Sequence, residues 1–182
     1  MKTVRLLGAV TAFTLAPLVH GFELASNDIQ AGEFMPKAQE FQGFGCDGGN
    51  TSPHLAWRDA PEGTRSFAVT AYDPDAPTGS GWWHWIVFNI PANVSELPTG
   101  AGDPASGIAP AGLAQHRTDY GTPGFGGACP PAGDKPHRYQ FKVFALDVER
   151  LDVSPDSSAA LVGFMLNAHK LDVAELEALY QR

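Results

Sequence analysis

Three runs of alternating apolar residues constrain the fold of this chain more than any other feature of its sequence. They span residues 66–72, 84–90 and 138–146. Side chains point to alternate faces along a β-strand, so each run can present one apolar face to a core. Helical spacing appears only near the end of the chain. This order, strands first and helices last, predicts a mainly β fold with an antiparallel sheet and peripheral, C-terminal helices.

A titratable residue stands at the end of each run. Asp73 follows the first run, His84 opens the second, and His137 directly precedes the third. Strict alternation gives them apolar neighbours on the same face, which are Phe67, Val69 and Ala71 for Asp73, Ile86, Phe88 and Ile90 for His84, and Tyr139, Phe141, Val143 and Ala145 for His137. Strand ends meet in a hairpin, so we expect the three at one rim of the sheet. Such convergence is typical of a small-ligand site, and three separate, satisfied polar residues are the alternative.

The remaining segments give weaker expectations. Residues 22–29 predict an edge strand, residues 34–59 are loop-like, and residues 98–112 predict a long surface loop because they are dense in Gly, Pro and Ala. Asp172 and Glu175 resemble a capping box at the start of a second terminal helix. The first terminal helix is predicted by four apolar residues at helical spacing, Leu161, Phe164, Met165 and Ala168.

The first 21 residues have the pattern of a secretory signal peptide. Lys2 and Arg5 give a positive start, and an apolar run follows at residues 6–19. Pro17 interrupts that run, and a membrane anchor needs about 20 apolar residues. We therefore predict export to the periplasm or the medium, with residues 22–182 forming a single domain and no integral membrane segment.

The chain has two cysteines, Cys46 and Cys129, and both lie in glycine-rich loops. An exported protein meets an oxidising compartment, which favours a disulfide between them. Two unpaired thiols are the alternative. Two cysteines are too few for a structural zinc site, which needs four ligands, and we predict neither a metal nor a cofactor.

The charge of the chain excludes two classes of partner. Its 12 Lys and Arg face 20 Asp and Glu, which gives a formal net charge of −8. Nothing in the sequence resembles the basic stripe that nucleic acid requires. For the same reason an anionic membrane surface is not expected to attract the protein.

Two long motifs resemble the signature of the phosphatidylethanolamine-binding family, and specifically its bacterial Raf-kinase-inhibitor-like branch. The first motif combines DPDAP at residues 73–77 with WWHWIVFNI at residues 82–90, and the second runs through GTPG, CPP and HRY at residues 121–124, 129–131 and 137–139. The resemblance extends from about Ser26 to the C-terminus. It implies a large antiparallel sheet with a smaller second sheet.

The resemblance also implies a pocket for a small anion, such as phosphate, a phosphoethanolamine-like group or a phospholipid head group. Trp83 replaces a histidine often found in eukaryotic members, and the chain stops at Arg182 without the long C-terminal segment of animal members. Both departures weaken the case for assigning this chain the lipid preference or the kinase partner of eukaryotic members. Three possibilities stay open, which are a kinase- or protease-inhibitor-like role, a protein partner and a homodimer. The family's pocket positions fall on Asp73, Pro77, Trp82, His84, Tyr120, Pro130, Pro131, His137 and Tyr139.

An enzyme is the rival hypothesis. Asp73, His84 and His137 would suit a hydrolase or a metal site with two histidines and one carboxylate. No GxSxG motif supplies a nucleophile, and the hydroxyls of Thr78 and Ser80 lie in a glycine-flanked loop. We therefore predict a binding protein in which Asp73 positions a protonated histidine, and raises its pKa, rather than contacting the anion.

Export is directly testable. We expect the mature protein, recovered from its host, to begin after or near Gly21, because the small residue there follows the apolar run. Amino-terminal sequencing measures this, and a mature protein that begins at Met1 would contradict it.

Overall fold

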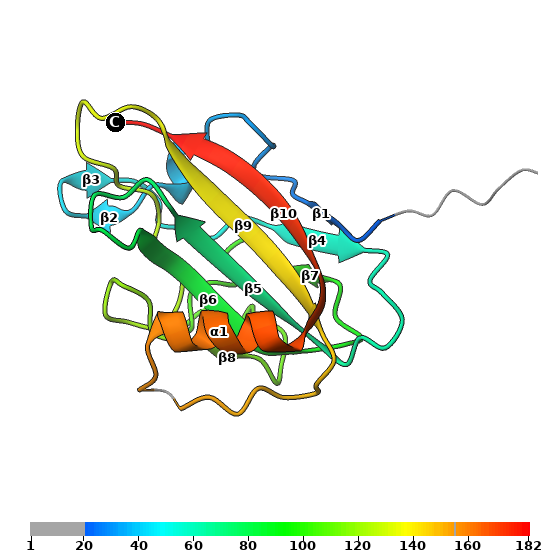
Figure 1. Ribbon diagram of the computed structural model, residues 1–182. Coiled ribbons are helices and arrows are strands. Elements are labelled where there is room, and N and C mark those ends of the chain that lie inside the picture. The colour runs from blue at the N-terminus through cyan, green and yellow to red at the C-terminus, as the bar shows by residue number, and fades with distance from the viewer. Residues whose placement is uncertain (1–20, 155) are drawn as a thin grey trace, which may run out of the picture.

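The computed structural model describes residues 21–154 and 156–182, so the predicted signal peptide lies, apart from Gly21, outside the described residues. A five-stranded sheet with the order β10-β9-β5-β6-β8 dominates the fold (Figure 1). Each neighbouring pair in this sheet is antiparallel, which confirms the predicted fold class. Its strands are β5 (Ser66–Asp73), β6 (Trp82–Pro91), β8 (Ala114–Gln115), β9 (His137–Leu146) and β10 (Lys170–Tyr180).

Two smaller sheets and a helix complete the architecture. The three-stranded sheet consists of β1 (Glu23–Ala25), β4 (Leu55–Arg58) and β7 (Glu96–Leu97), and the two-stranded hairpin of β2 (Gln42–Gly43) and β3 (Cys46–Asp47). A short 3-10 helix spans Lys37–Gln39, and α1 spans Ala159–His169. Strand β1 is shorter than predicted. The segment expected to be loop-like contains β2, β3 and β4.

The main hydrophobic core lies between the three-stranded sheet and the large sheet. The indole of Trp57 meets the ring of Phe67 at a centroid distance of 5.3 Å. Helix α1 crosses the other face of the large sheet (Figure 1) and encloses a second, smaller core there. The main core joins Leu55, Trp57 and Leu97 to Phe67, Val69, Trp85, Val87, Phe141 and Val143, and the smaller core joins Ala68, Ile86, Phe88 and Phe144 to Val162 and Leu166.

Helix α1 confirms the first of the two predicted helices. Its N-cap is Ser158, whose hydroxyl accepts a hydrogen bond from the backbone N–H of Leu161 at 3.2 Å. The helix has 11 residues. Within the described part of the chain, no helix is both long and apolar enough to cross a membrane.

The second predicted helix is wrong, because the residues after Asp172 belong to strand β10. This strand pairs with β9 in antiparallel register, so that Glu175 lies opposite Lys142 and Glu177 opposite Gln140. Both pairs interact, at 3.2 Å and 3.0 Å respectively, as cross-strand neighbours do. The apolar residues that suited a helix also fit period two, since the buried positions are Ala174, Leu176, Ala178 and Tyr180.

A bulge in β6 sets the direction of His84. Ala71 of β5 pairs with Trp85, but the next residue, Tyr72, pairs with Trp83. His84 is therefore an extra residue in β6 that has no partner in β5. A β-bulge of this kind re-aims a side chain that alternation would send to the opposite face.

The predicted shared face of His84 with Ile86 and Phe88 is therefore wrong. Ile86 and Phe88 lie in the smaller core under α1, whereas His84 lines a cavity together with Asp73 on the other side of the sheet. Ile90 lies in the main core because a second irregularity interrupts the pairing between Phe67 and Val69 of β5. Strict alternation in β6 holds only between the two irregularities, from Trp85 to Phe88.

Cys46 of β3 and Cys129 form a disulfide, as predicted, at a sequence separation of 83. We expect the double replacement Cys46→Ala and Cys129→Ala to lower the free energy of unfolding by about 2–4.5 kcal/mol, because the cross-link restricts the unfolded chain. Urea denaturation of both proteins measures this. Reductant should destabilise the wild type and leave the variant unchanged. Equal urea midpoints for both proteins, with and without reductant, would contradict the structural role of the disulfide.

Candidate functional site

A cavity of about 170 Å³ opens at the end of the large sheet. Its size suits a small group, since pockets for drug-sized ligands measure about 300–1,000 Å³. Asp73 ends β5, His84 lies near the start of β6, and His137 starts β9, so the predicted rim of strand ends exists. The structure brings all nine predicted site residues to this cavity, namely Asp73, Pro77, Trp82, His84, Tyr120, Pro130, Pro131, His137 and Tyr139. Their role in ligand binding stays a prediction.

Asp73 is a buried carboxylate that ties two parts of the site together. Its Oδ1 accepts hydrogen bonds from the backbone N–H groups of Asp75, at 2.8 Å, and Ala76, at 3.1 Å. Its Oδ2 lies 2.8 Å from Nδ1 of His137, and both side chains are less than 5% exposed. A carboxylate only accepts, so Nδ1 of His137 carries the hydrogen and donates it. Asp73 therefore fixes the turn after β5 and the ring at the start of β9.

The same turn is held to β9 a second time. The guanidinium of Arg138 donates to both carboxylate oxygens of Asp75, at 2.8 Å and 3.1 Å, and the backbone N–H of Arg138 donates to the same carboxylate. These hydrogen bonds lower the pKa of Asp75 to about 2. The turn that carries Pro77 and Thr78 into the cavity wall is therefore anchored at neutral pH.

His84 contacts backbone rather than Asp73. Its Nδ1 lies 2.7 Å from the carbonyl oxygen of Gly126 and 3.2 Å from that of Gly127. Carbonyls only accept, so Nδ1 carries the hydrogen and Nε2 is the nitrogen that can serve the cavity. Burial lowers the pKa of His84 more than the nearby Asp73 carboxylate raises it. Asp73 therefore raises this pKa, as expected, but the expectation of a pKa above the ordinary histidine value is wrong for His84, whose ring is neutral at pH 7.

Aromatic residues form much of the cavity wall. The Tyr120 hydroxyl donates to the carbonyl of Gly127 at 2.7 Å, and its ring covers Gly126, where a Cβ would lie 2.2 Å from a ring carbon. Burial, assisted by the charge of Asp73, raises the pKa of both Tyr120 and Tyr139. Among the described residues, the Tyr139 hydroxyl and the indole N–H of Trp82 are buried without a hydrogen-bond partner. The Tyr139 hydroxyl lies beside Asp73 and the Trp82 indole beside Tyr120, so these two donors have polar neighbours but no acceptor at good hydrogen-bond geometry.

Beyond the nine predicted ligand-binding residues, four further residues line the cavity, which are Phe44, Ala76, Thr78 and Cys129. Ala76 and Thr78 flank the predicted Pro77, and Cys129 precedes the predicted Pro130, so adjacency in sequence was a usable signal. Phe44 was not recognisable in this way. It comes from the β2–β3 hairpin, which the disulfide, Arg182 and stacking on Tyr120 connect to the rest of the site.

Comparison with known proteins identifies the family. A family profile described as phosphatidylethanolamine-binding protein matches residues 25–181.

The chain belongs to the phosphatidylethanolamine-binding protein family.

Two proteins of Escherichia coli (strain K12) are similar to this member of the family. The UPF0098 protein YbcL is 54% identical over 181 residues, an alignment that covers 100% of this chain and 99% of YbcL. The UPF0098 protein YbhB is 52% identical over 160 residues, which cover 87% of this chain and 99% of YbhB. The bacterial branch suggested by the motifs is confirmed.

Solved structures share the phosphatidylethanolamine-binding fold. The crystal structure of Escherichia coli YbcL, described as a new member of the mammalian PEBP family, matches with a TM-score of 0.86 at 58% identity and covers 88% of this chain and 98% of its own. A putative phosphatidylethanolamine-binding protein homologue from Chlamydia trachomatis matches with a TM-score of 0.72 at 30% identity, covering 88% and 97% of the two chains.

The Asp73–His137 pair gives a stability prediction. Asp73→Asn removes the charge that accepts from His137, and we expect the free energy of unfolding to fall by about 1.5–3 kcal/mol, the range for hydrogen bonds to charged groups. Urea denaturation at pH 7 measures it. Asp134→Asn is the matched control, because its carboxylate lies 3.5 Å from Nε2 of the same ring but is 45% exposed, and exposed pairs contribute about 0–1 kcal/mol. Equal losses in both variants would contradict the special role of Asp73.

Proposed function

We propose that this protein is an exported binding protein whose cavity holds a small anionic group, such as phosphate or the phosphate ester of a head group. Membership of the phosphatidylethanolamine-binding family implies an anion site. The observation that carries the proposal is the pair of donors at the cavity wall, the Trp82 indole N–H and the Tyr139 hydroxyl, that have no acceptor at good hydrogen-bond geometry. A buried donor without an acceptor costs about 1–3 kcal/mol, and an anion's oxygens would supply the acceptors.

The state of His84 makes anion binding depend on a proton. In the free protein its hydrogen is on Nδ1, committed to the carbonyls of Gly126 and Gly127, so Nε2 is an acceptor. An anionic oxygen beside Nε2 favours the imidazolium, which donates from both nitrogens. The anion therefore raises the pKa that burial had lowered, and binding takes up a proton. The new positive charge also lies between the anion and the carboxylate of Asp73.

Binding, rather than catalysis, fits the groups around the cavity. The sulfur of Cys129 is in the disulfide, and the Thr78 hydroxyl donates to the carbonyl of Gly81, so neither is arranged as a nucleophile next to a histidine base. Among residues 21–154 and 156–182, no cluster of three His, Cys, Asp or Glu side chains is arranged to hold a metal ion. These contacts give no support to a hydrolase or metal-dependent reaction on Asp73, His84 and His137.

Two observations support export. The family match begins at residue 25, after the apolar run. The alignment with YbcL covers 100% of this chain. The alignment with YbhB includes 99% of YbhB but only 87% of this chain. The disulfide is suited to an oxidising compartment. Together they favour a cleaved leader and a mature domain that works in the periplasm or outside the cell.

Titration calorimetry with dimethyl phosphate tests the proposed function, because this diester keeps one charge across the pH range. We expect affinity to fall as pH rises, by at most about tenfold per pH unit, because one proton is taken up on binding. The decline should begin at the lowered pKa that His84 has in the free protein and end at its raised pKa in the complex. His84→Ala and His137→Ala should each weaken binding at pH 6 by about 1.5–3 kcal/mol.

The control is His169→Ala. His169 also contacts a carboxylate, that of Asp147 at 3.1 Å, but it belongs to α1 and does not line the cavity. Its replacement should leave affinity unchanged. An affinity for dimethyl phosphate that is independent of pH or rises with pH would contradict the proposal, since binding would then take up no proton.

A further inference from the structure

Phe44 is both part of the cavity wall and largely exposed to solvent. Its side chain is among the residues that line the cavity, yet the residue is 72% exposed. An apolar side chain that stays in water gains no hydrophobic stabilisation on folding, so this ring does not contribute to the core. It forms part of the cavity's rim, beyond the buried groups that would hold an anion.

The backbone at Phe44 is strained. Strands β2 and β3 pair Gly43 with Cys46, which leaves Phe44 and Gly45 as a two-residue turn. Both have positive φ, 55° and 85°, as in type I′ turns, where Asn-Gly is the favoured sequence. A phenylalanine in left-handed backbone is uncommon, and such conformations cluster at ligand clamps.

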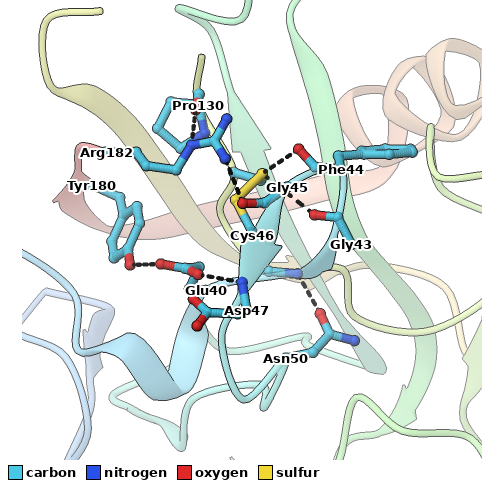
Figure 2. The surroundings of a disulfide bond; sticks show 12 residues. Glu40, Gly43, Phe44, Gly45, Cys46, Asp47, Asn50, Pro130, Tyr180 and Arg182 are labelled. Atoms are coloured by element: carbon cyan, nitrogen blue, oxygen red, sulfur yellow. Dashed lines mark hydrogen bonds between the residues drawn. A yellow bond between two sulfur atoms is a disulfide. The ribbon is translucent and has the colours of Figure 1, made fainter. Parts of the chain in front are cut away.

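Two clamps hold the strained turn against the cavity. The disulfide joins Cys46, directly after the turn, to Cys129 in the cavity wall. The guanidinium of Arg182 donates to the carbonyl of Gly45 at 2.8 Å and to the carbonyl of Pro130 at 3.1 Å, which bridges the same two loops without a covalent bond (Figure 2). The turn is therefore held at the two residues that directly follow Phe44.

One face of the Phe44 ring is supported from within. It stacks on Tyr120 at a centroid distance of 5.9 Å and an interplanar angle of 20°. Tyr120 in turn stacks on Phe41 at 4.2 Å. The three rings form a continuous aromatic surface that begins at the cavity wall, beside His84, and ends at the exposed ring.

We propose that Phe44 is an apolar subsite for the substituent that a bound anion carries. The ligand class that fits is an anionic ester with an apolar group beside the charged head, whose charged part enters the cavity while its apolar part lies on the Phe44 ring. This inference rests on the proposed anion site and adds to it the residue that separates such esters from small free anions.

The test compares two phosphate diesters of the same charge, dimethyl phosphate and methyl hexyl phosphate, by titration calorimetry at pH 6. We expect the wild type to prefer the hexyl ester by about tenfold, because one face of the ring leaves water on binding. Phe44→Asn should reduce this preference to within about threefold, and because the preference is the ratio of two affinities, any change common to both esters cancels. Asparagine is favoured at this turn position, so the variant should unfold at the same temperature as the wild type or a higher one.

Phe164→Asn is the matched control. Phe164 is 67% exposed on α1 and does not line the cavity, so its replacement should keep the wild-type preference. Equal affinity of the wild type for both esters, or a preference that survives Phe44→Asn, would overturn the apolar subsite while the anion site stands. If the wild type binds neither ester, the anion site fails and the subsite fails with it.

Discussion

The buried carboxylate of Asp73 is the group on which the site depends. It accepts from two backbone N–H groups of the turn that follows β5 and from the imidazole of His137 at the start of β9. The Asp73 side chain is 4% exposed. A charge buried to this degree is tolerated inside a protein only when hydrogen bonds surround it. Because the partners come from a turn and from a neighbouring strand, satisfying this one charge also sets the shape of the cavity between them.

Much of this arrangement was visible in the sequence. Runs of alternating apolar residues predicted β5, β6 and β9, and the titratable residues at their ends predicted the rim where Asp73, His84 and His137 meet. Alternation failed where the strand is irregular. His84 reaches the cavity through a bulge. A bulge shifts the phase of a period-two pattern, but residues 85–88 are all apolar, so the shift could not be recognised in the sequence. The prediction for the C-terminal segment failed for another reason. Its apolar residues fit both the helical period and the strand period, and pairing with β9 decided in favour of the strand.

The electrostatics of the cavity depend on contacts that side-chain patterns do not carry. The pKa of His84 was expected to rise beside Asp73, but burial lowers it, and the carbonyls of Gly126 and Gly127 fix the hydrogen on Nδ1. Phe44 escaped notice because its place at the rim depends on the disulfide and on Arg182. The cavity that results is lined largely by aromatic rings and is poor in fixed positive charge. We propose that an anion binds there by recruiting a proton instead of meeting a permanent cation.

Nitrogen-15 NMR of the His84 imidazole tests this claim most directly. The signals are assigned by their loss in His84→Ala and recorded at pH 7 in the free protein and with saturating dimethyl phosphate. Our account predicts a neutral ring with its hydrogen on Nδ1 in the free protein, and an imidazolium protonated on both nitrogens in the complex. An imidazolium in the free protein, or a ring that stays neutral when the anion is bound, would contradict it.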